Sequence, residues 1–239
     1  ETLRHRDTSI WVFPEGTRSY DNVVKRFHKG AFFLAQEFDL DVVPVYLLGN
    51  GDVLPKGDIL IFGGALNPVI GERIGANDMD FGVDYGSRTK QITQHYRSNY
   101  EKLRHKFEGV HYFSKKIVLA YLFKDEEIVD AVKRHINAYA THYHSLRDVI
   151  AAAVKINHLS DSYGEFDYLL SLQKGQRKVV GIIADAEKRA VAESIYWRKH
   201  RQVNFTETMD AADNVLVVHP TLLLSDFQVE KLSFFQLST

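Results

Sequence analysis

The fold of this chain is decided by a stretch that runs VKINHLSDSYGEFDYLLSLQKGQRKVVGIIAD, from Val154 to Asp185. An apolar run lies near each end, and a polar turn and a segment of helical spacing lie between them. This alternation predicts parallel strands joined by helices, in a βαβαβ unit like those of doubly wound nucleotide-binding folds. The expected elements are strand Val154–Leu159, helix Phe166–Leu172, strand Val179–Ile183, helix Ala186–Trp197 and strand Asn214–Val218.

The earlier part of the chain also alternates strands and helices. Two segments have apolar residues at helical spacing, Gly30–Phe38 and Ser87–Phe107. A connection over Gly109–Lys116 then precedes a long apolar stripe that begins after Asp125. We therefore predict an α/β chain of two domains, residues 1–110 and residues 111–239. The strands expected in the first domain are Thr8–Phe13, Asp39–Leu48, Asp58–Phe62 and Asn67–Ile70.

The composition excludes several classes of function. The 239 residues contain no cysteine, which rules out disulfides, thiolate metal ligands and a cysteine nucleophile. A formal net charge of -1 gives no electrostatic argument for a nucleic-acid partner, and we expect no metal site. No apolar run reaches the roughly 20 residues that a membrane-spanning helix needs. Because the chain opens with a polar segment at Glu1, we expect it to be part of a longer polypeptide.

A second stretch, Phe13–Ser19 (FPEGTRS), has the composition of an anion-binding turn. An apolar run precedes it, and a proline and Gly16 turn the chain. Arg18 then offers a planar fork of N–H donors that suits phosphate oxygens, beside the hydroxyl of Thr17. Glu15 could orient Arg18 or a substrate hydroxyl. These residues predict a loop that binds a phosphate group.

This heptapeptide resembles the third conserved block of the glycerol-3-phosphate and lysophosphatidate acyltransferase family. Downstream, Phe27-His28-Lys29-Gly30-Ala31 resembles the family's Phe-Lys-x-Gly-Ala element, and Val42-Val43-Pro44-Val45 resembles its apolar fourth block. The resemblance implies that the loop binds the phosphate and glycerol of the acceptor. The substrate-binding residues that it implies are Glu15, Gly16, Thr17 and Arg18, with Lys29 and Gly30 in a secondary role.

The catalytic motif of that family is absent from this sequence. In the family, the histidine of a His-x-x-x-x-Asp motif deprotonates the acceptor hydroxyl, which attacks an acyl thioester, and the aspartate orients the histidine. None of the eleven histidines here has an aspartate five residues later. We therefore expect an acyltransferase segment that supplies acceptor binding, with acyl-CoA or acyl carrier protein as donor, a lysophospholipid-type acceptor and no cofactor. The alternative is a catalytically inactive chain that binds anionic lipid or a protein partner.

The stretch quoted first resembles another family, the class I S-adenosylmethionine-dependent methyltransferases. In that family the first strand leads into Gly-x-Gly-x-Gly, whose glycines let the backbone approach the cofactor. Here Ser160 and Ser162 occupy the first two glycine positions, and only Gly164 remains. Ile183 stands where the family has the acid that binds the ribose, and Asp185 follows two residues later.

This second resemblance implies an incomplete Rossmann-like, methyltransferase-like domain. Gly164 and Asp185 are the positions left for a cofactor, and we expect no binding of S-adenosylmethionine. A methyltransferase remains the third hypothesis for the function. An acyltransferase loop followed by such a domain resembles bacterial polypeptides that join a lipid exporter, a lysophospholipid acyltransferase and a methyltransferase.

Helix Ser87–Phe107 has a basic face opposite its apolar face. The simple interpretation is a solvated face, and the alternative is contact with an anionic membrane surface. With the fusion resemblance, the alternative implies the cytoplasmic side of the membrane, as a peripheral protein or within a membrane-anchored polypeptide. The basic residues are Arg88, Lys90, Arg97, Lys102, Arg104 and Lys106.

Overall fold

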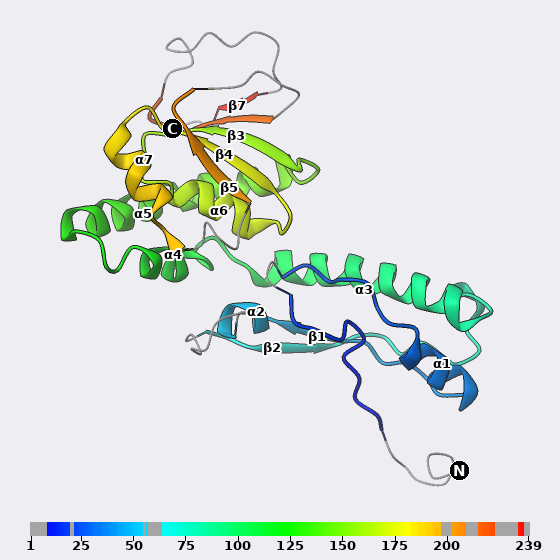
Figure 1. Cartoon of the computed structure of the whole chain (residues 1–239). Coiled ribbons are helices and arrows are strands. Elements are labelled where there is room, and N and C mark those ends of the chain that lie inside the picture. Colours follow the sequence, from blue (N-terminus) through cyan, green and yellow to red (C-terminus); the bar gives the residue numbers. More distant parts are fainter. Residues whose placement is uncertain are drawn as a thin grey trace. The chain divides into compact units, whose positions relative to one another are not determined.

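The computed structural model divides the chain into two compact units, Glu1–Phe107 and Glu108–Thr239. Figure 1 shows the helices and strands of each unit. The structure describes residues 9–19, 22–54, 56, 64–196, 202–208 and 215–222, and the backbone of 234–236. Each unit has a hydrophobic core of its own, so each is described separately.

The first unit combines a small antiparallel sheet with a long helix. Strands β1 and β2 pair in the register Val45↔Ile70 to Leu48↔Asn67. The helix α3 lies along this sheet, and the hydroxyl of Tyr96 on α3 donates to the carbonyl of Val45 at 2.8 Å. The elements are α1 (Gly30–Glu37), β1 (Val45–Leu48), α2 (Asn50–Val53), β2 (Asn67–Ile70), the 3-10 helix η1 (Met79–Phe81) and α3 (Tyr85–Phe107).

The core of the first unit lies between α1, α3 and the loop that precedes α1. Phe27 and Phe32 stack with ring centroids 6.1 Å apart, and Tyr96 meets the ring of Phe27 edge-on at 5.3 Å. Val24, Ile74 and Ile92 complete the buried cluster. This core is small and much of the unit is irregular chain. Hydrogen bonds from α3 hold several of these irregular segments.

The second unit contains a parallel sheet with the strand order β5-β4-β3-β6-β7 among the described residues. In chain order within this unit that is 3-2-1-4-5, the order of doubly wound folds, with the reversal between β3 and β6. The α/β fold predicted from the sequence is therefore confirmed. The elements are α4 (Ser114–Ala120), α5 (Glu126–Val149), β3 (Lys155–Leu159), α6 (Glu165–Gln173), β4 (Lys178–Ile182), α7 (Ala186–Glu193), β5 (Val203–Thr206), β6 (Val215–Val218) and β7 (Phe234–Gln236).

Alternation along the strands gives this sheet two buried faces. Ile156, Val179 and Val217 point to one face and pack with the helices α4, α5 and α6, which lie on that side of the sheet in Figure 1. Neighbouring residues point the other way, because successive side chains of a strand lie on opposite faces. Leu159, Ile182, Leu216 and Val218 form the smaller cluster on that second face.

The structure corrects the expected strand Thr8–Phe13. Its described residues, from Ser9 on, are irregular, and Trp11 and Phe13 are 74% and 73% exposed. Apolar and β-branched composition favours a strand only where a neighbouring strand supplies the ladder of hydrogen bonds. Among the described residues no strand pairs with this run, so the prediction of a buried strand is wrong for them.

The other expected strands of the first unit have mixed outcomes. The run Asp39–Leu48 is a strand only over Val45–Leu48, and Val42 makes a single antiparallel bridge to Ile74. The strand Asn67–Ile70 is found with the predicted bounds. The expected strand Asp58–Phe62 lies outside the described residues.

Several elements of the second unit were not predicted from the sequence. The helix α4 lies partly within the segment interpreted as a connection, and its buried Ile117 packs into the core. The strand β5 alternates buried Val203 and Phe205 with exposed Asn204, a signal of period two that was present but short. The strand β7 has only three residues. The helix predicted to reach Trp197 ends as α7 at Glu193, and residue 197 is outside the described part of the chain.

One prediction concerns Arg88, a basic residue of α3 that is only 5% exposed. Its guanidinium donates to the carbonyls of Asp78 and Gly75, each at 2.9 Å. We expect Arg88→Met to lower the free energy of unfolding by about 3 kcal/mol, because two charge-assisted bonds are lost and two carbonyls lose their partner. Urea unfolding followed by circular dichroism measures it. Lys90→Met is the matched control, since Lys90 is exposed, and an equal loss in both variants would contradict the buried role of Arg88.

Candidate functional site: an anion-binding loop

The FPEGTRS segment forms a tight exposed turn. The backbone N–H of Gly16 donates to the carbonyl of Phe13 at 3.1 Å, and Gly16 has a left-handed φ of +66°. A Cβ at Gly16 would lie 3.1 Å from Nε2 of His28, so the imidazole packs directly over the glycine. The N–H of His28 in turn donates to the carbonyl of Pro14 at 2.7 Å. Backbone angle and imidazole contact both favour glycine at this position.

Glu15 makes a structural contact, and its predicted role in substrate binding stays a prediction. Its carboxylate accepts the backbone N–H of Lys25 at 2.8 Å, which ties the turn to the segment that precedes α1. That segment is held by α3, because Nε of Arg97 donates to the carbonyl of Val24 at 2.9 Å. Glu15 therefore fixes the position of the loop, and none of its described hydrogen bonds is to Arg18.

Arg18 and Thr17 are exposed and face the segment that follows α2. Nη1 of Arg18 lies 3.4 Å from the carbonyl of Leu54. The ammonium of Lys56 donates to the hydroxyl of Thr17 at 2.7 Å. The structure thus brings together two residues that the sequence predicted and a third, Lys56, that it did not. Its position beside the turn depends on how the chain folds back after β1, which no local pattern indicates.

Lys29 and Gly30 lie at the start of α1. The ammonium of Lys29 is 6.0 Å from the ring centroid of Tyr85, the first residue of α3. It is also attracted by the carboxylate of Asp84, which precedes that helix. Its described contacts are therefore at the beginning of α3 and not with Arg18. A Cβ at Gly30 would meet nothing within 4 Å, so packing does not demand glycine there. Their secondary role in substrate binding stays a prediction.

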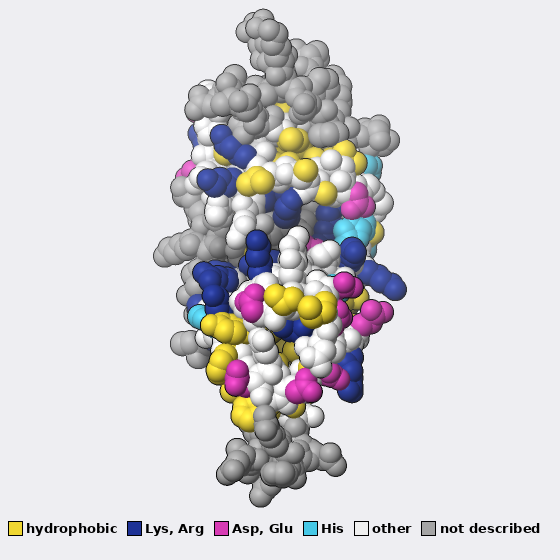
Figure 2. Space-filling view, turned by 90° about the vertical axis from the view of Figure 1, so that its right-hand side faces the viewer, with side chains coloured by type: hydrophobic (Ala, Val, Ile, Leu, Met, Phe, Trp, Pro, Cys, Tyr) yellow, Lys and Arg dark blue, Asp and Glu magenta, His cyan; other side chains and the backbone are white. Residues whose placement is uncertain are grey.

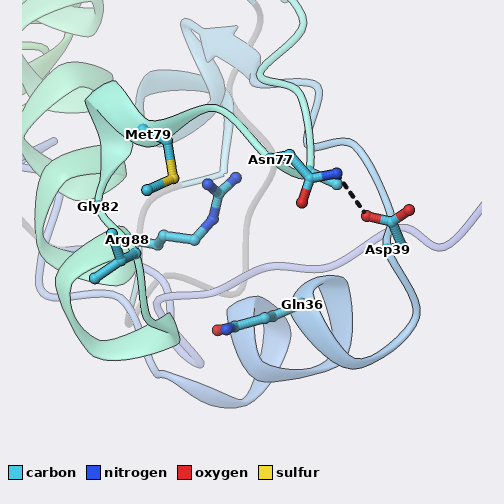
Figure 3. Close-up of a pocket in the computed structure, with 8 residues that line it drawn as sticks. Gln36, Asp39, Asn77, Met79, Gly82 and Arg88 are labelled. Atoms are coloured by element: carbon cyan, nitrogen blue, oxygen red, sulfur yellow. Dashed lines mark hydrogen bonds between the residues drawn. The ribbon is translucent and has the colours of Figure 1, made fainter.

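A separate pocket of about 80 Å³ lies between α1 and the loop that leads to α3. In Figure 3 the side chain of Arg88 extends across it, and Asn77 donates to Asp39 at 3.2 Å. Nη1 and Nη2 of Arg88 donate to backbone carbonyls, as described above. The pocket is lined by none of the residues predicted for acceptor binding.

The basic side chains predicted to form an exposed face of α3 are only partly exposed. Arg88 and Arg104 are buried, so that part of the prediction is wrong, while Lys90, Lys102 and Lys106 are exposed. In the lower half of Figure 2, which shows one face of the first unit, acidic side chains lie among hydrophobic and basic ones. Among the described residues, no helix is both long enough and apolar enough to cross a membrane.

In the second unit, the loop between β3 and α6 is closed by its own side chains. The hydroxyl of Ser160 donates to that of Ser162 at 2.6 Å and accepts the Ser162 N–H, and the Ser162 hydroxyl accepts the N–H of Gly164. Glu165 accepts the N–H of Tyr163 at 2.8 Å. The backbone donors that would face a ligand at this edge of the sheet are thus satisfied within the loop.

The last glycine of this loop serves packing. Gly164 has a φ of +86°, and a Cβ there would lie 2.6 Å from Cβ of Ala192 and 2.9 Å from the ring of Phe205. Asp185, two residues after buried Ile183, caps α7 by accepting the N–H groups of Glu187 and Lys188. The bond from Lys188 holds the pKa of the Asp185 carboxyl below its usual value. Each of the two predicted cofactor positions has a structural role.

Beneath this loop lies a fully buried polar network. Nδ1 of His158 is 2.9 Å from Asp167, and its Nε2 is 2.7 Å from the hydroxyl of Tyr143. Burial raises the pKa of Tyr143, so the hydroxyl stays protonated. Burial also lowers the pKa of His219, after β6, to about 3, so it is neutral near pH 7. Among the described residues, no group of histidines and carboxylates is arranged to hold a metal ion.

Comparison with known proteins finds similarity over the N-terminal stretch that contains the FPEGTRS turn. Residues 1–48 match the acyltransferase family. A chloroplastic 1-acyl-sn-glycerol-3-phosphate acyltransferase of Brassica napus is 44% identical over 55 residues, 23% of this chain and 16% of that protein. The Saccharomyces cerevisiae 1-acyl-sn-glycerol-3-phosphate acyltransferase is 47% identical over 59 residues, 23% of this chain and 20% of that protein. The matched stretch therefore spans a fifth or less of these relatives.

One solved structure has a distant likeness to part of this chain. The plantazolicin methyltransferase BpumL shares 18% sequence identity with this chain, at a TM-score of 0.30, over 46% of this chain and 48% of that one. At this score the likeness supports no argument about function.

The geometry of the turn leads to a prediction for Gly16, with Gly30 of α1 as the comparison. We expect Gly16→Ala to lower the free energy of unfolding by about 1–2 kcal/mol, because a left-handed conformation is costly for residues with a Cβ and His28 must also move. Gly30→Ala, within a helix and with open space around it, should not destabilise the protein. Urea unfolding of both variants measures the difference. Equal stabilities would show that the turn does not need glycine at position 16.

Proposed function

We propose that this chain supplies the acceptor-binding part of an acyltransferase that transfers an acyl group from a thioester to a lysophosphatidate-type hydroxyl. The observation that supports it is the exposed FPEGTRS turn, which lies inside the stretch that matches acyltransferases. The guanidinium of Arg18 lies at the surface of this turn, with the Thr17 hydroxyl beside it. These are the donors that a phosphate group requires.

The proposed reaction needs a general base. The His-x-x-x-x-Asp motif that supplies it in the acyltransferase family is absent from this sequence. None of its histidines is followed by aspartate at the spacing of the family's motif. By itself, then, the chain is proposed to bind the acceptor without transferring the acyl group. The acyl donor is proposed to be acyl-CoA or acyl carrier protein. The base would come from the rest of a longer polypeptide. Because the acceptor is a lipid, we propose that the reaction takes place at a membrane surface, on the cytoplasmic side that the resemblance to fusion polypeptides implies.

Acyl transfer by the full-length gene product tests this proposal. Lysophosphatidate is the acceptor, and acyl-CoA and acyl carrier protein are compared as donors. We expect Arg18→Ala to raise the KM for lysophosphatidate about 10- to 100-fold with a smaller change in kcat, because a charge-assisted phosphate contact contributes roughly 1.5–3 kcal/mol. Lys102→Ala, an exposed lysine of α3, is the control. An unchanged KM in Arg18→Ala would remove Arg18 from the phosphate site.

For the second unit we propose a scaffold that does not bind S-adenosylmethionine. Three observations support it: the serine hydroxyls satisfy the loop donors, Ile183 cannot accept a hydrogen bond from a ribose, and Asp185 caps α7. Such a domain can follow the acyltransferase part of a fusion polypeptide without a reaction of its own.

Titration calorimetry with S-adenosylmethionine checks this second proposal. We expect no saturable heat at millimolar cofactor for the wild-type chain. Saturable binding to the wild-type chain would overturn the proposal and restore the methyltransferase hypothesis.

A further inference from the structure

The pocket between α1 and the loop that leads to α3 is lined by a buried positive charge. The side chain belongs to Arg88, which is only 5% exposed. Among the described residues no carboxylate forms an ion pair with Arg88, whereas the exposed Arg73 pairs with Asp41 at 3.1 Å. Removing a charge from water is costly unless an opposite charge or hydrogen bonds compensate it. The guanidinium therefore favours a negatively charged group beside it.

The hydrogen bonds of this guanidinium leave donors for such a group. A guanidinium has five N–H groups, one on Nε and two on each terminal nitrogen. In the described part of the chain, Nη1 and Nη2 of Arg88 each donate to one backbone carbonyl, of Asp78 and of Gly75. Each terminal nitrogen thus keeps a second N–H, and Nε keeps its own. Two N–H groups of a guanidinium match the two oxygens of a carboxylate.

The size and lining of the pocket suit a small organic acid. Its volume is about 80 Å³, and since a water molecule occupies roughly 30 Å³ in the liquid, the space equals roughly two to three waters. Ala76, Met79 and Val83 line it with apolar side chains. Met79 and Val83 are 66% and 68% exposed, so a ligand would cover apolar surface that now faces water.

The opposite side of the pocket limits the charge of the ligand. In Figure 3 the carboxylate of Asp39 lies across the pocket from Arg88, held by the amide of Asn77 at 3.2 Å. One guanidinium faces one carboxylate, so a group with two negative charges, such as a phosphate monoester, would be only partly compensated. A carboxylate has a single negative charge and is the better match.

We propose that this pocket binds a small monocarboxylate, whose carboxylate group pairs with Arg88 and whose short carbon chain contacts Ala76, Met79 and Val83. The site is separate from the FPEGTRS turn and shares no residue with it. The inference therefore goes beyond the proposed function and does not depend on it.

Titration of the full chain with acetate, followed by nuclear magnetic resonance at constant ionic strength, tests the inference. We expect acetate to shift the Nε–H signal of Arg88 and the backbone amide signals of Asn77 and Gly82 saturably. The expected dissociation constant is on the order of 1 mM, which is within the limit for a ligand of so few atoms. Acetamide has the same shape without the charge and should leave these signals unchanged. Inorganic phosphate should bind here at least about tenfold more weakly, because of Asp39.

Four variants locate the binding. Ala76→Leu fills the pocket and leaves Arg88 in place, so it should weaken acetate binding at least about tenfold. Arg88→Lys keeps the charge but loses the planar fork and should also weaken binding about tenfold. Lys90→Gln removes an exposed charge from the same helix and should change nothing. Arg18→Gln, in the FPEGTRS turn, should also leave acetate binding unchanged.

Several results would overturn the carboxylate site. Acetate and acetamide giving the same shifts would do so, and so would wild-type binding by Ala76→Leu. An effect of Lys90→Gln as large as that of Arg88→Lys would show a general effect of charge. Loss of acetate binding in Arg18→Gln would place the anion at the turn, which would end this proposal and leave the proposed function standing. The comparison of acetate with acetamide on the wild-type chain stays decisive if a variant fails to fold.

Discussion

Hydrogen bonds from side chains of α3 to backbone carbonyls of other segments hold the first unit together. Arg88, Tyr96 and Arg97 each donate to the backbone of a different segment: the loop before α3, the strand β1 and the segment before α1. The unit has a small core and much irregular chain, so the polar backbone groups of those loops need partners outside regular structure. The anion loop depends on this arrangement, because Arg97 holds the segment whose Lys25 N–H anchors Glu15.

The two candidate ligand-binding loops of this chain differ in whether their hydrogen-bond donors are exposed or are satisfied within the loop. In the FPEGTRS turn, the carboxylate of Glu15 and the carbonyl of Pro14 are used to fix the backbone, and Arg18 is left at the surface. In the loop after β3, two serine hydroxyls and Glu165 take up the backbone donors internally. A glycine has no hydroxyl, so with glycine at positions 160 and 162 these N–H groups would lack the acceptors that the serines provide.

Much of the architecture could be predicted from local pattern. The structure has the strands Asn67–Ile70 and Lys155–Leu159 and the helix α3 within a few residues of the expected bounds, and α5 lies where the apolar stripe after Asp125 was expected. The run before Phe13 has the same kind of pattern and is exposed and irregular. Strand formation there needs a partner strand that composition does not specify. Arg88 shows the same limit, since its position on a basic face indicates solvent, whereas its guanidinium is buried against two carbonyls.

By itself, the sequence determined the α/β class, the turn at Gly16, the presence of Arg18 and Thr17 in it, and the serines at positions 160 and 162. These are local properties, set by residue type and by the conformations that glycine and proline allow. Only the tertiary structure decided that Glu15 anchors the turn through Lys25 and that Lys56 lies against Thr17. Such contacts join residues up to 39 positions apart, and their existence depends on how loops fold back over a helix, which no local pattern encodes.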